Sequence, residues 1–231
     1  MNDKIQLTKD EWASLVENKL ENHSLDGQVL RVLAQIPLLI RRARLCMAAD
    51  SSDVFEREQL HKEACDIRTQ LQPLLQQVRA RLDRNDLDLV ADYAGPPQQH
   101  RLVHVIYVRS YGFTLMAGII IDLICDSLNM GQAPSNEEEM RGFAEDIIAL
   151  ALIAKKYRPL GSIIMLGCLC ASHAATLDEH IQQRSAELLQ EYRVDFAGPD
   201  AKPYDEELRW VRQRFTLKET RLYLQAFENY T

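Results

Sequence analysis

The strongest constraint on the fold is a stripe of apolar residues at helical spacing within residues 53–82. These positions repeat at intervals of mostly four and three residues, which is the period of one face of an α-helix. They are Leu60, Ala64, Ile67, Leu71, Leu74, Val78 and Leu82. Pro73 lies inside this segment and predicts a kink or a break in the helix. The same period recurs along most of the chain and strand-like alternation is nearly absent, so we expect an all-α fold.

Turn residues and capping signals divide the rest of the chain into further helices. We expect helices opening at Thr8 and spanning residues 25–49, 98–129, 137–156, 159–177, 178–193 and 204–231. Pro37 is expected to kink the second of these. The sequence therefore predicts a single all-α domain over residues 1–231, with about eight helices and long central helices packed as an irregular bundle. The stretch 83–97, which ends in Gly95-Pro96-Pro97, is the candidate for an internal break.

Charge and cysteine content narrow the class of protein. The net charge is −7 and no basic block is present, which argues against direct nucleic-acid binding because that binding depends on neutralising phosphates. The five cysteines are an odd number without a CxxC pair, so we expect a reducing compartment, the cytoplasm or the nucleus. Residues 1–11 are polar and do not resemble a signal peptide. Residues 159–177 carry no charged residue, and we expect a buried helix there rather than a membrane span.

Three polar residues at helical spacing form the candidate site on the expected helix 98–129. His104, Tyr111 and Asp122 fall on one face, and His173 lies in the apolar helix 159–177. We predict a pocket between these two helices, lined by all four residues. An imidazole and a carboxylate there could perform general acid–base chemistry. The same pattern is also typical of an imperfectly apolar core face.

Asp122 is a charged residue in a segment that is expected to be buried. It follows Ile119-Ile120-Ile121, where an unpaired carboxylate would be costly to bury. Either it lines a polar pocket or it pairs with an arginine or a backbone donor. Asp126 lies one turn away, but the pair lacks the second acidic motif of a diphosphate site.

Two histidine-containing patterns resemble metal ligands, and neither is convincing. His100 and His104 are four residues apart on one helix face, without a third ligand near them in sequence. In Cys168-x-Cys170-x-x-His173 the two thiols would point about 200° apart on a helix. No metal and no cofactor are therefore predicted.

Several short blocks carry a family resemblance. They are Ile36-Pro37-Leu38-Leu39, Tyr107-x-Arg109-Ser110-Tyr111-Gly112, Tyr157-Arg158-Pro159-Leu160-Gly161-Ser162, Met165, Cys168-Leu169, Ala174-Ala175-Thr176, Glu191-Tyr192 and Asp195-Phe196. From about residue 28 onward the chain resembles the C-terminal regulatory region of fungal Zn₂Cys₆ (C6 zinc finger) transcription factors. That resemblance implies a helical fold. The Cys- and Lys-rich zinc cluster that reads DNA in the family is absent, so it implies no DNA binding for this chain.

The resemblance and the residues leave three functions open. The first is a stand-alone regulatory domain that binds an apolar small molecule or a protein partner. The second is a cofactor-independent cyclase or isomerase of fungal secondary metabolism, with His104 or His173 as acid or base and Asp122 orienting them. The third is a partner-binding domain without a pocket. We expect no direct contact with nucleic acid or membrane, and a homodimer is left open.

Overall fold

The computed structural model describes residues 24–48, 54–90, 97–128, 137–159 and 162–195. These residues form helices and short turns, and no strand occurs among them, so the predicted all-α class is confirmed. The expected helices opening at Thr8 and spanning 204–231 lie outside the described residues. The total of about eight helices therefore stays a prediction.

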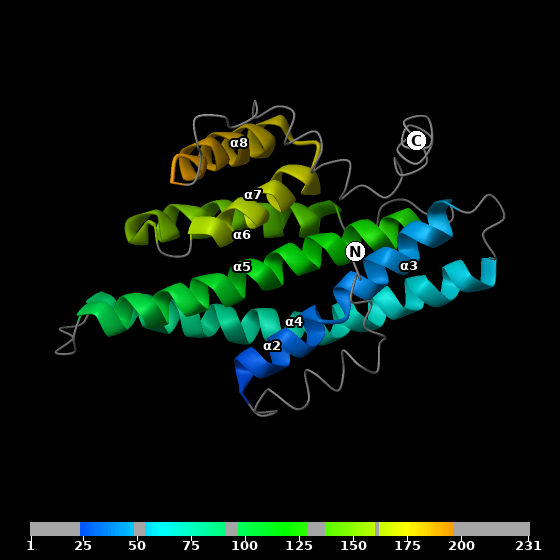
Figure 1. The fold of residues 1–231 in the computed structure, drawn as a ribbon, viewed down its shortest axis with the longest axis horizontal. Coiled ribbons are helices and arrows are strands. Elements are labelled where there is room, and N and C mark those ends of the chain that lie inside the picture. Colours follow the sequence, from blue (N-terminus) through cyan, green and yellow to red (C-terminus); the bar gives the residue numbers. More distant parts are fainter. Residues whose placement is uncertain (1–23, 49–53, 91–96, 129–136, 160–161, 196–231) are drawn as a thin grey trace, which may run out of the picture.

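Two long helices, α4 (Val54–Val90) and α5 (Pro97–Leu128), run alongside each other through the centre (Figure 1). The short helices α2 (Leu25–Leu33) and α3 (Ile36–Ala48) pack against this pair on one side. On the other side, α6 (Glu137–Ala154) and α7 (Ser162–Ala175) pack against α5. The outermost helix, α8 (Glu179–Arg193), contacts α7 and α6, and the short 3₁₀ turn η1 (Lys155–Tyr157) follows α6.

Helix α4 carries the apolar stripe, and all seven of its predicted positions are buried. The helix is continuous over 37 residues, so of the kink or break expected at Pro73, the break does not occur. Pro73 is exposed, and a helix can accommodate a proline there by bending around its solvent-facing ring. The helix also continues to Val90, so residues 83–90 of the predicted break are helical, and residues 91–96 lie outside the described part of the chain.

The predicted helix 25–49 is two helices, α2 and α3, separated at Ala34–Gln35. Pro37 is the second residue of α3, a position where its missing N–H breaks no hydrogen bond. Ser24 caps α2 by accepting a hydrogen bond from the Gly27 N–H at 3.0 Å. The proline thus begins a new helix instead of kinking an existing one.

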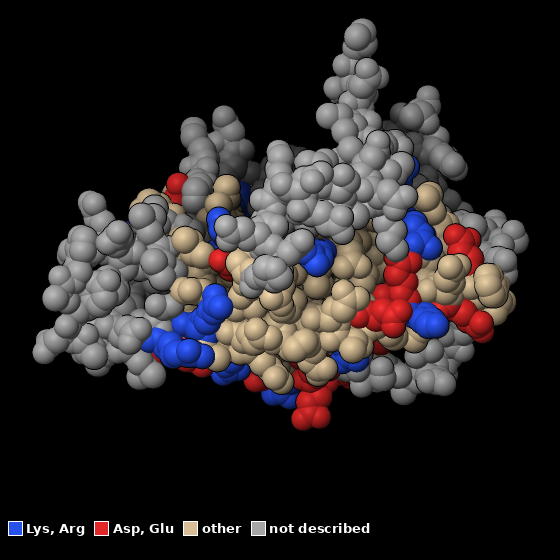
Figure 2. Space-filling view, turned by 90° about the horizontal axis from the view of Figure 1, so that it is seen from below, with Lys and Arg blue, Asp and Glu red and all other residues tan. Residues whose placement is uncertain are grey.

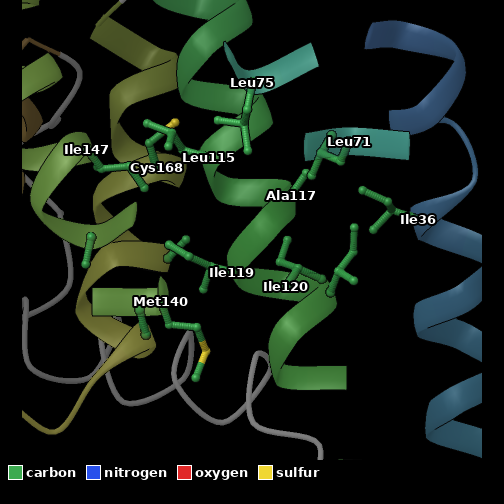
Figure 3. Close-up of a cluster of buried hydrophobic side chains, with 14 of the residues drawn as sticks. Ile36, Leu71, Leu75, Leu115, Ala117, Ile119, Ile120, Met140, Ile147 and Cys168 are labelled. Atoms are coloured by element: carbon green, nitrogen blue, oxygen red, sulfur yellow. The ribbon is translucent and has the colours of Figure 1, made fainter. Parts of the chain in front are cut away.

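One continuous apolar cluster contains buried residues from every described α-helix. In Figure 3, Leu71, Leu75 and Leu115 mark the contact of α4 with α5, while Ile147 and Cys168 come from α6 and α7. A buried helix was expected over 159–177, yet Ile163 and Gly167 of α7 are exposed and α5 is buried along more of its length. The α5 segment Val105–Leu128 is long and apolar enough to cross a membrane, and 72% of an apolar 18-residue stretch within it is buried inside the protein, as in an ordinary core helix.

Candidate functional site

The four predicted site residues lie on α5 and α7. Tyr111 and Asp122 are buried residues of α5, and His173 is a half-buried residue of α7. His104 belongs to α5, but its side chain lies outside the described part of the structure. The geometry of the candidate site therefore rests on Tyr111, Asp122 and His173.

Tyr111 belongs to a three-helix polar contact that we call the Tyr111 centre, formed by Arg79, Tyr111 and Asp146. The Tyr111 hydroxyl donates to Asp146 Oδ2 of α6 at 2.8 Å, and Arg79 Nη1 of α4 donates to the same oxygen at 3.1 Å. Burial, followed by the hydrogen bond to Asp146, raises the pKa of Tyr111 well above its ordinary value. The phenol therefore stays protonated and acts as a hydrogen-bond donor.

Asp122 belongs to a second contact, the Asp122 centre, formed by Arg68, Asp122 and Glu139. Its side chain is fully buried, and Arg68 Nε of α4 lies 2.9 Å from Asp122 Oδ1. Arg68 also pairs through Nη2 with Glu139 of α6. Of the two alternatives that the sequence left open, the geometry shows pairing with an arginine.

The two centres share one antiparallel register between α4 and α5. Arg68 and Arg79 are eleven residues apart on α4, and their partners Asp122 and Tyr111 are eleven residues apart on α5. Eleven residues correspond to about three helical turns, or about 16 Å. Tyr111 and Asp122 thus lie on the same side of α5, facing α4 and α6, but are too far apart to exchange a proton within one acid–base site.

The predicted pocket between α5 and α7 is closely packed at Gly112. A Cβ atom at this position would lie 3.0 Å from Cys168 Sγ and 3.2 Å from the Met165 methyl carbon of α7. On its other side it would lie 3.4 Å from Leu150 of α6. The glycine therefore allows three helices to approach one another closely at this point.

Residues 110–112 connect α5 to its surroundings in three directions. Ser110 donates to Asp26 of α2 at 3.2 Å, Tyr111 reaches Asp146 of α6, and Gly112 contacts α7. Residues 110–112 therefore serve packing and hydrogen bonding between helices.

A second polar contact joins Arg158, which follows η1, to the C-terminal end of α8. Arg158 binds Asp195 through two hydrogen bonds of 2.5 and 2.6 Å, and donates to the Glu191 carbonyl at 2.9 Å. Its guanidinium lies 5.3 Å from the centre of the Tyr192 ring. Tyr192 in turn donates to the Ala151 carbonyl at 2.7 Å. Residues 158 and 191–195 therefore hold α8 against α6.

Sequence reasoning missed the partners of the two centres, namely Arg68, Arg79, Glu139 and Asp146. The two arginines recur after three helical turns of α4, so they share a face, and this is the signal that could have identified them. It also missed a group of metal-binding side chains. Among the described residues, His61, Cys65 and Cys125 have ligand atoms that all lie within 4.8 Å of one another.

The pattern Cys168-x-Cys170 differs from this group because its two thiols do not converge. Cys168 is completely buried and burial raises the pKa of its thiol to about 12, whereas Cys170 is only half-buried. The two side chains therefore face different surroundings, as expected for positions two residues apart on a helix. They do not converge on one metal.

No protein-family model, no curated protein and no solved structure matches this chain. The arrangement of its own residues is therefore the basis for a functional proposal.

Proposed function

We propose that this chain is a stand-alone helical binding domain, of the type that the resemblance to fungal transcription-factor regulatory regions implies, and that it acts through a protein partner. It makes no direct contact with DNA and works in the cytoplasm or the nucleus. It has about eight helices in one irregular bundle. A small apolar ligand is the other occupant that such a domain could bind.

The observation that carries the proposal is a contrast between the interior and one end of the molecule. Where a ligand pocket was expected, α5, α6 and α7 are in van der Waals contact around Gly112. At the end of α3 and the beginning of α4, by contrast, Leu45, Val54 and Phe55 are 62, 51 and 71% exposed. These helix ends lie at the same end of the molecule (Figure 1). Exposed aromatic and aliphatic side chains at one end of a molecule favour a protein interface there.

The enzyme alternative receives less support from the geometry. Tyr111 donates to Asp146 and Asp122 pairs with Arg68, so both groups already serve contacts between helices. Their separation along α5 also prevents them from acting on one substrate atom.

The charge distribution supports the absence of direct DNA contact. On the face shown in Figure 2, positive and negative side chains are interspersed around an area without charged residues. A duplex-binding surface would instead gather Lys and Arg on one face. With a net charge of −7, the chain has no excess of cations to neutralise phosphates.

Native mass spectrometry of the full chain, purified from the cells that produce it, tests the proposal. The expected result is a discrete added protein mass. Phe55→Ser should abolish it, because the aromatic ring would be the anchor of the interface. Val194→Ser is the matched control, since Val194 is 75% exposed at the end of α8, far from the α3–α4 end in sequence and in the fold.

The other outcomes are equally informative. A doubled mass that Phe55→Ser abolishes would identify the partner as a second copy of this chain. A small-molecule mass that survives Phe55→Ser would overturn the protein-partner proposal in favour of a ligand. The bare chain alone, in every preparation, would contradict a binding function.

A further inference from the structure

The side chains of His61, Cys65 and Cys125 converge from two helices at one point between α4 and α5. His61 and Cys65 are four residues apart and share a face of α4, and Cys65 Sγ lies 3.9 Å from His61 Nδ1. Cys125 comes from α5. Cys65 lies three residues before Arg68 on α4, and Cys125 lies three residues after Asp122 on α5, so the two cysteines follow the antiparallel register that pairs Arg68 with Asp122. All three ligand atoms lie within 4.8 Å of one another.

The Cys65–His61 separation is close to that of a tetrahedral zinc site, and the two separations that involve Cys125 are at most 4.8 Å. With Zn–S bonds of about 2.3 Å and Zn–N bonds of about 2.0–2.1 Å, tetrahedral ligands are about 3.8 Å apart for two sulfurs and about 3.6 Å apart for sulfur and nitrogen. The Cys65–His61 separation exceeds the second value by about 0.3 Å. Small rotations of the His61 and Cys65 side chains would place these two atoms at bonding distance, and Cys125 Sγ would approach by at most about 1 Å.

Charge and burial favour a divalent ion with soft ligands. Two thiolates and one neutral imidazole neutralise a 2+ ion, which suits a position where Cys125 is only 5% exposed. His61 and Cys65 are half-buried, so an ion can reach them from solvent. Thiolate and imidazole ligands select zinc over calcium or magnesium, which prefer oxygen.

We propose that His61, Cys65 and Cys125 bind one Zn²⁺ ion, with water in the fourth coordination position. The ion would connect α4 to α5 about one turn from the Asp122 centre. Because the ligands come from two helices that meet only in the folded chain, bound zinc would raise the free energy of unfolding.

Titration of the metal-free, chemically reduced full chain with Zn²⁺ and with Co²⁺ tests the site. We expect one ion per chain and an intense sulfur-to-cobalt charge-transfer band in the near ultraviolet. Zn²⁺ at a hundredfold excess over its dissociation constant should raise Tm by about 5–10 °C. Cys65→Ser and His61→Ala should each weaken binding by about a hundredfold or more, because even outer-sphere partners contribute 10- to 100-fold.

Cys170→Ser is the matched control, because Cys170 is also a half-buried thiol, on α7. It should retain the Co²⁺ band and the shift in Tm. Cys125→Ser alters a buried position, so circular dichroism of its metal-free form must first match the wild type; Cys65→Ser carries the test if it does not. Alkylation gives a second readout, because bound Zn²⁺ should protect the half-buried Cys65 but leave the half-buried Cys170 reactive.

Two results would overturn the proposal. One is a wild-type chain without a thiolate–cobalt band at saturating Co²⁺. The other is undiminished binding in both Cys65→Ser and His61→Ala, which would place the ion elsewhere. Neither result affects the proposed partner binding, which depends on Phe55 and not on the three proposed zinc ligands.

Discussion

The Asp122 centre and the Tyr111 centre have the same construction but differ in what they bury. Each joins an arginine of α4, a residue of α5 and an acid of α6. In the first, the buried residue is a carboxylate with a fully buried side chain, and its arginine is 30% exposed. In the second, the buried residue is a phenol, and the charged pair Arg79–Asp146 is 57 and 31% exposed. The two centres thus allow the effect of burying a charged carboxylate to be compared with that of burying a neutral hydroxyl in the same helix interface.

This difference determines how much each arginine contributes to stability. A carboxylate in the core requires its cation, because burying an uncompensated charge has a large free-energy cost. A neutral phenol requires only an acceptor, and Asp146 provides one whether or not Arg79 is present. An ion pair that is open to solvent contributes little by itself. We therefore expect the two arginines to differ strongly although their geometry is similar.

The largest expected effect is that of Arg68→Met. It removes the cation that lies 2.9 Å from the buried Asp122 carboxylate, and should lower the free energy of unfolding by about 3 kcal/mol or more. Chemical denaturation of the wild type and the variant measures the difference.

The control for this prediction restores an uncharged interface. Arg68→Met combined with Asp122→Leu should recover most of the lost stability, because an apolar pair of similar volume often replaces a buried ion pair without loss. A double variant no more stable than Arg68→Met would show that the arginine acts mainly through packing of its side chain.

A second prediction concerns alkaline pH. Tyr111 has an ordinary pKa of 10.0 that folding raises, so above about pH 10 the unfolded chain releases this proton while the folded chain keeps it. The contribution of Tyr111 to the free energy of unfolding is therefore fully present below about pH 10. It is lost as the pH rises, by up to about 1.4 kcal/mol per pH unit. Denaturation from about pH 9 to about pH 11 should show a shallower decline in Tyr111→Phe than in the wild type.

Tyr192 is a second buried tyrosine and provides a comparison for the pH experiment. Burial also raises the pKa of Tyr192, which donates to the Ala151 carbonyl. Tyr192→Phe should therefore make the decline shallower by a similar amount. Identical pH dependence in the wild type and Tyr111→Phe would contradict a protonated, buried phenol.

A smaller effect is expected from Tyr111→Phe at neutral pH. The change removes one hydrogen bond and keeps the ring in place, so the loss should be about 1 kcal/mol. Thermal or chemical denaturation at neutral pH measures it. A loss as large as that of Arg68→Met would mean that the hydroxyl organises the whole interface of α5 with α6.

The sequence predicted the helices well because their signals are local. The stripe from Leu60 to Leu82 needs only the helical period, and every one of its residues is buried. Proline was harder to interpret, because its effect depends on the side of the helix on which it lies. Pro73 is exposed and tolerated within α4, whereas Pro37 begins α3.

The candidate site could be predicted only in part because its contacts join distant segments. Asp122 was identified as a carboxylate in need of a partner, but Arg68 lies 54 positions earlier in the chain, on another helix. In the same way, Cys65 and Cys125 are far apart in sequence and meet only through the register of α4 with α5. Cys168 and Cys170 are close in sequence and resemble a metal-binding pattern, yet helix geometry separates their thiols.

The smallest expected effect is that of Arg79→Met, and it provides the sharpest contrast with Arg68→Met. Arg79 is the more exposed partner of a surface ion pair, so its loss should lower stability by about 0.5 kcal/mol or less. Tyr111 would still donate to Asp146, and the remaining carboxylate would stay accessible to water. Denaturation of both variants at low and high salt measures the contrast, since screening weakens exposed pairs much more than buried ones. The Arg79 effect should vanish at high salt while the Arg68 effect persists; equal losses for the two arginines would show that burial of the carboxylate does not set their contributions.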